Sequence, residues 1–298
     1  TYLGMRRLRL DPFSMLFGFS FMLSVPMFVI VSSSINNDPL SFLGCAIVTT
    51  SLLYSYDAKS NSTALSMFLV GIMIVSFTKA TGALSALCLL SAFAIINSDH
   101  VRRFVFAVNR KWFSVAAASL AAIVVYYAII HSIYGRFFPA AQGDPSVWFS
   151  KLTPDAPKWG LLENLSQFKN MLFYTSSRPY GHVIYPDLPI RVTIVEIMLI
   201  LFPIFGTLPF LGKDRGQPAY RPFIAALFLG IFLFAIVYFS KIRALHLSTG
   251  YTGSIHARYF FGFLPAAAIL FAIGFSFLRK PLLKALLMSL FVAGASLL

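Results

Sequence analysis

The stretch that decides the fold is Phe223 to Ser240, FIAALFLGIFLFAIVYFS, in which no residue is charged. A helix needs roughly 20 apolar residues, each rising about 1.5 Å, to cross a hydrocarbon core of about 30 Å. The whole chain of 298 residues has this character, because 58% of it is hydrophobic, 11% is charged and its mean hydropathy is +0.79. A water-soluble core cannot absorb so much apolar surface. Long apolar runs without alternation predict an all-α, polytopic transmembrane helix bundle and exclude a β-barrel.

Nine apolar runs follow one another along the chain, and each predicts one membrane helix. They fall at about 13–33, 40–56, 63–78, 82–97, 113–134, 192–212, 223–240, 259–278 and 285 onward. One long polar segment, 135–190, separates the fifth run from the sixth and is rich in Pro, Asn and aromatic residues. It is too long for a simple turn, and such loops commonly carry function. The sequence therefore predicts a single transmembrane domain over 1–298, with 135–190 as an external loop region.

The basic residues predict which side of the membrane each connection faces. The formal net charge is +14, yet the Lys and Arg residues form small groups between apolar runs instead of one soluble face, which excludes nucleic acid as a partner. Cytoplasmic loops hold an excess of such residues. The groups in alternate connections are Arg6, Arg7 and Arg9; Lys59; Arg102, Arg103, Arg110 and Lys111; Lys213, Arg215 and Arg221; and Arg279, Lys280 and Lys284. The remaining connections are therefore predicted to be external.

The ends of the chain and its cysteines carry further expectations. Arg6, Arg7 and Arg9 precede a full-length apolar run without a small-residue cleavage site, so no secretory signal is predicted. The chain begins without Met and ends inside an apolar run, and we expect a fragment that lacks the N-terminal helices. Cys45 and Cys88 lie singly inside apolar runs, where a cysteine serves as a small packing residue.

The first predicted external turn holds Asn36, Asn37 and Asp38, followed by Pro39. Pro favours the first turn of a helix, and Asp38 suits the N-cap position just before it. Capping alone would explain Asp38. The other reading is that its carboxylate and the two amides line the rim of a pocket, and the two readings are compatible.

Two cations stand on the predicted external side, where topology disfavours them. Lys79 lies in the segment FTKATG (77–82), and Arg258 follows His256 at the start of an apolar run, where a cation opposes the helix macrodipole. One interpretation is that each residue is an interfacial anchor whose side chain reaches the lipid headgroups. The other is that each binds an anionic phosphate, which the guanidinium fork of Arg258 matches through two hydrogen bonds.

The long external loop interleaves aromatic side chains such as Trp148 with polar ones such as Arg178 and His182. This mixture is typical of an amphipathic belt lying on the membrane, and it also suits a sugar-binding surface. Glu196, well inside the sixth apolar run, is expected to face the bundle and to pair with Arg191 or another cation. The chain shows no zinc-ligand spacing, nucleophile elbow, phosphate-cradling glycine loop or dinucleotide fingerprint, so cytosolic nucleotide chemistry is not expected.

Three short segments, in this order, resemble membrane glycosyltransferases of the GT-C type. They are SSSINNDPL (32–40), FTKATG (77–82) and HARYF (256–260), the last followed by Leu264-Pro265. The chain is most similar to a bacterial family of predicted membrane proteins that share a domain of unknown function. The resemblance covers nearly the whole chain.

The resemblance implies a GT-C-like bundle that transfers a sugar from a polyprenyl-phosphate donor to a glycan, lipid or protein acceptor of the cell envelope. The active face would be the external face of a bacterial inner membrane, and membrane lipids would surround the chain. A departing lipid phosphate needs cations, and an acceptor hydroxyl needs a carboxylate base. We expect Lys79, Arg258 and His256 to bind the donor phosphate, and Asn36, Asn37, Asp38, Arg178, His182 and Tyr259 to line the substrate pocket.

One departure from the superfamily pattern leaves the catalytic residue unassigned. Such enzymes carry a catalytic acid in the first external loop, and nothing before Asp11 matches that loop. We therefore expect the acid to lie outside this sequence and do not assign Asp38 to its role. The sequence predicts no cofactor and names no metal ligand, and a divalent metal stays as an alternative.

Three other functions remain as alternatives. An envelope polysaccharide polymerase or ligase would bind a pyrophosphate-linked glycan through outer Arg and His residues, and Arg178, His182, His256 and Arg258 suit that task. A transporter would favour inverted repeats, broken helices and midplane charges, whereas the sequence shows no obvious repeat and one acid well inside a run. A non-catalytic assembly subunit is the third.

Overall fold

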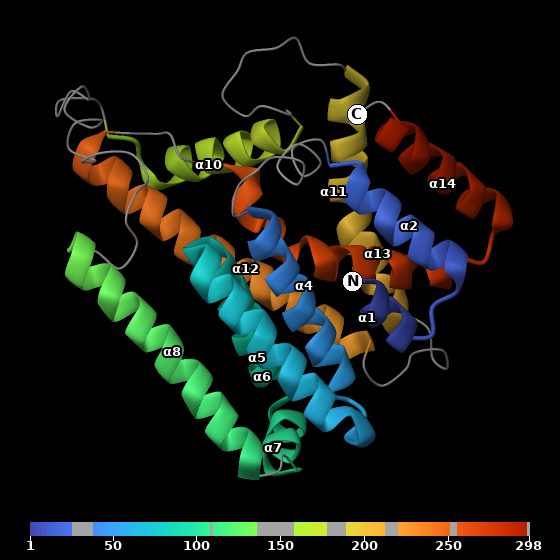
Figure 1. The fold of residues 1–298 in the computed structure, drawn as a ribbon. Helices are drawn as coiled ribbons and strands as arrows, with labels where there is room; N and C mark the ends of the chain where they lie inside the picture. Colours follow the sequence, from blue (N-terminus) through green and yellow to red (C-terminus); the bar gives the residue numbers. More distant parts are fainter. Residues whose placement is uncertain are drawn as a thin grey trace.

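The computed structural model describes residues 1–25, 38–107, 110–135, 158–177, 189–211, 220–250 and 255–296. All regular structure within these ranges is helical, with no strand among them (Figure 1). The all-α prediction is therefore confirmed for the described part of the chain.

Within the described ranges, four helical segments are long and apolar enough to cross a membrane. They are α5 (Asn61–Thr78), α8 (Arg110–Tyr134), α12 (Tyr220–Thr249) and the continuous pair η2 (Ala257–Phe263) and α13 (Leu264–Phe277). Helices α6 (Ala80–Ile96) and α7 (Ser98–Ala107) add a fifth if the pair, which is bent by 102°, forms one span. These apolar helices show that the chain has the character of an integral membrane protein.

The predicted count of nine membrane helices is too high for the described residues. The other apolar runs form shorter apolar helices, namely α2 (Pro12–Leu23), α4 (Asp38–Tyr54), and parts of α11 (Pro189–Leu211) and α14 (Pro281–Ser296). A helix of 12 residues, the length of α2, rises only about 18 Å, which is short of a hydrocarbon core of about 30 Å. An apolar run by itself does not distinguish a crossing helix from a shorter helix packed against others.

Helix α13 forms the centre of the core. Within it Ile269, Leu270 and Phe271 have no exposed surface. Rings from the neighbouring helix α2 stack on it, with the Phe17 and Phe275 ring centroids 4.3 Å apart. Figure 1 shows α13 in the middle of the molecule and α8 along one edge. A helix that is apolar all round must be covered by protein or by lipid, and 72% of the α13 span but 0% of the α8 span is buried by protein.

Helices α4, α5 and α6 pack together and place the candidate site at one end. Gly44 of α4 meets α5 closely, since an added Cβ would lie 2.6 Å from Cγ1 of Val75. Helix α5 runs antiparallel to α4 (Figure 1), so α5 ends where α4 begins, and α6 begins two residues later. The three helices thereby bring Asp38, the first residue of α4, near the α5–α6 junction at Lys79.

The opposite end of α4 gathers several of the basic groups. Arg7, the last residue of α1 (Tyr2–Arg7), forms an ion pair with Asp57, which precedes η1 (Ala58–Ser60). At the same end Tyr56 donates a 2.9 Å hydrogen bond to Oδ1 of Asn97, and its ring stacks on His100 of α7. The cations on these elements are Arg6, Arg7, Lys59, Arg102 and Arg103. Such clustering is typical of a cytoplasmic face.

The segment 135–190 contains regular structure that the sequence reading missed. Helix α10 (Leu161–Ser177) lies within it and crosses the upper part of the molecule in Figure 1. Asn164, Phe168 and Thr175 are buried, and Leu162 is 81% exposed. Burial therefore follows the i, i+4, i+11 spacing of one helical face, so part of the predicted loop is an amphipathic helix docked on the bundle.

Candidate functional site

A small cavity opens where α4 and α6 begin and where η2 begins. Its volume is about 20 Å³, which is room for one or two water molecules. The residues that line it are Asp38, Ser41, Phe42, Lys79, Thr81, Gly82, Arg258, Tyr259, Phe261 and Gly262. The cavity thus brings together Asp38, Lys79 and Arg258, which are far apart in the chain and which the sequence analysis named as site residues.

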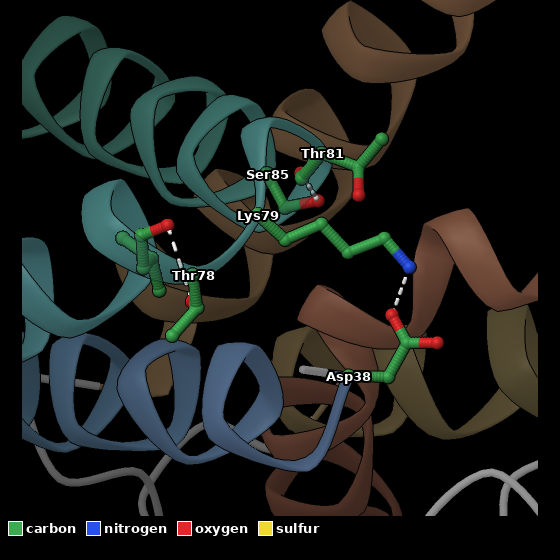
Figure 2. Close-up of polar contacts among 6 residues, drawn as sticks. Asp38, Thr78, Lys79, Thr81 and Ser85 are labelled. Atoms are coloured by element: carbon green, nitrogen blue, oxygen red, sulfur yellow. Dashed lines mark hydrogen bonds and ion pairs between the residues drawn. The ribbon is translucent and has the colours of Figure 1, made fainter. Parts of the chain in front are cut away.

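Lys79 reaches across the mouth of this cavity to Asp38. Its backbone is extended, at φ −155° and ψ 127°, and this single non-helical residue separates α5 from α6 as a break in the helix. Figure 2 shows its side chain running from that break to the carboxylate at the start of α4, where the two form an ion pair. The Lys79 and Asp38 side chains are only 22% and 17% exposed, respectively. Partial burial leaves this attraction less screened than that of a surface pair.

Arg258 brings a second cation to the cavity through the ring of Tyr259. The guanidinium carbon of Arg258 lies 5.4 Å from the Tyr259 ring centroid, and Nζ of Lys79 lies 5.7 Å from it. Both distances are within the range of cation–π attraction. Nε of Arg258 is buried and donates no hydrogen bond to any residue that the structure describes. A buried donor without an acceptor costs about 1–3 kcal/mol, so this nitrogen favours a ligand that supplies an oxygen.

Helix ends add to the positive potential of the cavity. Asp38, Ser41 and Phe42 belong to the beginning of α4, and Thr81 and Gly82 to the first turn of α6. The N-terminus of a helix carries about half a positive charge and unpaired N–H groups. No side chain caps the start of α6. Two helix starts and two cations therefore face one carboxylate.

The segment that carries Arg258 is held from three sides. The backbone N–H of His256 donates to the hydroxyl of Tyr238 on α12 at 3.1 Å, and that of Ala257 donates to Oγ1 of Thr175 on α10 at 2.9 Å. On the third side Gly262 lies so close to α6 that an added Cβ would be 2.6 Å from Cβ of Ser85 and 3.2 Å from Sγ of Cys45. The position of Arg258 is therefore fixed by α10, α12 and α6 together.

The other predicted site residues fall into three groups: one lines the cavity, one lies beside it, and the rest are not described. Tyr259 lines the cavity as expected. His256 is 6% exposed and lies beside the Tyr259 ring, at 6.1 Å between centroids, without being among the residues that line the cavity. Asn36, Asn37, Arg178 and His182 lie outside the described residues, as do the side chains of Arg191 and Glu196.

Sequence reasoning missed the apolar and small residues that shape the cavity. Ser41 follows Asp38 by three residues in α4, and Gly262 follows Tyr259 by three residues in η2, a 3₁₀ helix in which residues three apart share a face. Helical spacing of three or four places two residues on one face, and that signal was available in the sequence. Phe42, four residues after Asp38, and Phe261, three residues after Arg258, carry the same kind of signal. The spacing could not show that α4 and η2 meet around one cavity, because only tertiary contact brings these helices together.

Neither cysteine chemistry nor metal binding adds a centre elsewhere in the described ranges. Cys45 and Cys88 are free and buried, and Sγ of Cys45 donates a 3.5 Å hydrogen bond to the carbonyl oxygen of Gly82, which lines the cavity. Among the described residues, no group of three or more His, Cys, Asp or Glu side chains is placed to hold a metal ion.

Comparisons with known proteins found no relative: no family model, no curated protein and no solved structure matches the chain. The chemistry of the site therefore has to be argued from its own residues. The lining residues Lys79 and Arg258 exceed the single carboxylate of Asp38 by one positive charge. Such a site attracts an oxyanion, and its guanidinium and ammonium groups are the usual ligands of phosphate.

Proposed function

We propose that the protein is a membrane glycosyltransferase of the GT-C type that moves a sugar from a polyprenyl-phosphate donor to an acceptor of the cell envelope. The observation that carries the proposal is the cavity in which Lys79 and Arg258 share the Tyr259 ring, while Nε of Arg258 has no hydrogen-bond acceptor within the described ranges. The acceptor would be a glycan, a lipid or a protein.

The chemistry explains why two cations would be needed there. When the bond between the sugar and the phosphate breaks, the lipid phosphate keeps the bonding electrons and gains negative charge. Preorganised cations at that position stabilise the charge as it develops. Lys79 and Arg258 would contact the phosphate oxygens, and the starts of α4 and α6 would add their dipoles.

The surroundings suit a donor that arrives from the membrane. The cavity lies between helices that are themselves apolar, including η2 with α13, and Phe42 and Phe261 line it. A lipid-linked sugar needs no nucleotide site. We further propose that the domain lies in a bacterial inner membrane, with this cavity on the external face and the Arg7 end of α4 in the cytoplasm.

Loss of Arg258 should remove most of the activity. Arg258→Ala removes charge-assisted hydrogen bonds worth about 1.5–3 kcal/mol, so sugar transfer should fall about tenfold to a hundredfold. Arg258→Lys should also be impaired, because Lys keeps the charge but loses the planar fork. The measurement is transfer from a polyprenyl-phosphate sugar at matched membrane levels of protein.

Arg279→Ala is the matched control for this experiment. Arg279 is an exposed arginine just beyond the far end of α13, the helix that η2 leads into. Its loss should leave transfer unchanged. If Arg258→Ala keeps full activity and full donor affinity, Arg258 is an interfacial anchor and the proposed phosphate site is wrong.

The proposed orientation has its own test. The two native cysteines are buried, so a membrane-impermeant thiol reagent should give little background. A cysteine introduced at Pro157 should react from outside intact cells, whereas one introduced at Gln217 should react only after the membrane is opened. Reaction at Gln217 in intact cells would reverse the orientation.

A further inference from the structure

The cavity contains a carboxylate, which a site built only to hold phosphate would not need. Asp38 is 17% exposed in its side chain, lines the cavity and is paired with Lys79. A carboxylate beside a phosphate repels it, so Asp38 should weaken the binding of every anion and should weaken the more highly charged anions most.

The net charge of the residues that line the cavity indicates which kind of phosphate ligand the carboxylate would favour. Lys79 and Arg258 are offset in part by Asp38, which leaves one net positive charge among the lining side chains that the structure describes. A sugar joined to a lipid through one phosphate is a phosphodiester with one negative charge. A sugar joined through pyrophosphate carries two. The first balances the site, whereas the second leaves an excess negative charge next to Asp38.

We propose that Asp38 is a specificity residue that makes this site favour a singly charged phosphodiester over a doubly charged pyrophosphate. The proposal rests on the proposed function, in which Lys79 and Arg258 bind the donor phosphate. Selectivity of this kind needs an element that disfavours the wrong ligand, as well as contacts that favour the right one.

The residues that line the cavity beside Asp38 support the same selection. Phe42 and Phe261 line the cavity beside Asp38, and neither offers a hydrogen bond to further oxygens.

The test compares two ligands that differ in one phosphate. Citronellyl methyl phosphate carries one negative charge, and the methyl ester of citronellyl pyrophosphate carries two. Binding of each to the purified full chain in detergent is measured by calorimetry. The wild type should bind the first more tightly. In Asp38→Asn the ratio of the two affinities should shift about tenfold towards the pyrophosphate, since one repelling charge is gone.

Two controls separate the possible failures. Because each ratio is measured on one preparation, a fraction of unfolded Asp38→Asn protein affects both affinities alike and cancels. Asp38→Glu keeps the charge and should keep the wild-type preference. An unchanged ratio in Asp38→Asn would overturn the proposal. Lys79→Ala and Arg258→Ala should weaken both ligands, and if neither does, it is the phosphate site itself, and with it the proposed function, that fails.

Discussion

Helix α4 has an ion pair at each end, and the two pairs differ in what surrounds them. Asp57, beyond the last turn, accepts hydrogen bonds from the N–H of Lys59 at 3.1 Å and from Oγ of Ser60 at 3.2 Å in addition to its pair with Arg7. At the first turn, the Lys79–Asp38 pair lines a cavity with Arg258, whose Nε meets no acceptor in the part of the chain that the structure describes.

The difference separates a structural ion pair from one with binding capacity. Near Asp57, the carboxylate oxygens accept hydrogen bonds from residues close in sequence. The guanidinium carbon of Arg7 lies 5.4 Å from the centroid of the Tyr54 ring. Near Asp38, two cations line one cavity with a single carboxylate, and the same kind of aromatic contact serves two cations instead of one. Surplus charge beside a cavity, rather than the ion pair itself, identifies the candidate site.

Reversing each pair should break this comparison most strongly. The double variant Asp38→Lys with Lys79→Asp keeps the net charge but moves the cation away from Tyr259 and Arg258, so transfer should fall about a hundredfold. Arg7→Asp with Asp57→Arg should leave transfer within about twofold, because this pair lies away from the cavity and ion pairs in contact with solvent contribute little. Both are measured by transfer at matched protein levels. Equal losses in the two double variants would remove the distinction.

Removing the shared aromatic ring should have a smaller effect. Tyr259→Leu loses the attraction to Lys79 and Arg258, and cation–π contacts of about 0.5–2 kcal/mol each correspond to a roughly threefold to thirtyfold loss of donor affinity. Tyr259→Phe keeps the ring and should bind donor nearly as well as wild type. Tyr54→Leu, which removes the ring under Arg7, is the matched control and should not change donor affinity.

The smallest effect concerns acid stability at the Arg7 end. The hydrogen bond from Arg7, followed by that from the N–H of Lys59, holds the pKa of Asp57 below its ordinary value of 3.8. A lowered pKa stabilises the folded state above the ordinary value, and the stabilisation is lost as pH falls through the lowered one. The difference in Tm between wild type and Asp57→Asn should therefore shrink below about pH 4. A difference that stays constant with pH would show that ionisation of Asp57 does not contribute.

Composition and apolar runs predicted the helical class and most helix positions, but not which helices are long enough to cross. Helices α8 and α13 are both strongly apolar, yet none of the α8 span is buried by protein, whereas most of the span that contains α13 is. Hydropathy shows that a helix must be shielded from water, but it does not show whether protein or lipid provides the shielding. That choice depends on tertiary packing, such as the Phe17–Phe275 stack.

For the candidate site, the sequence identified the cations that are unfavourable at their predicted positions, but it did not predict which residues they contact. Lys79 and Arg258 stood out because cations are disfavoured on the predicted external side. Their common ring, Tyr259, and the pairing of Lys79 with Asp38 join segments far apart in the chain. No local pattern encodes such contacts, so a single sequence could name the residues without predicting that Asp38 would partly neutralise the site.

The close contact of Gly262 with Ser85 and Cys45 has a consequence for sequence divergence. Because a Cβ at 262 would lie 2.6 Å from Cβ of Ser85, a residue larger than Gly at 262 would be accepted only together with Gly at 85, or with a displaced η2 and a misplaced Arg258. The two positions should therefore covary in homologues, even where overall similarity has been lost. A set of homologues in which both positions carry bulky residues would contradict this. Paired small residues at these two positions, which follow the counterparts of Arg258 and Lys79, would help to recognise distant members.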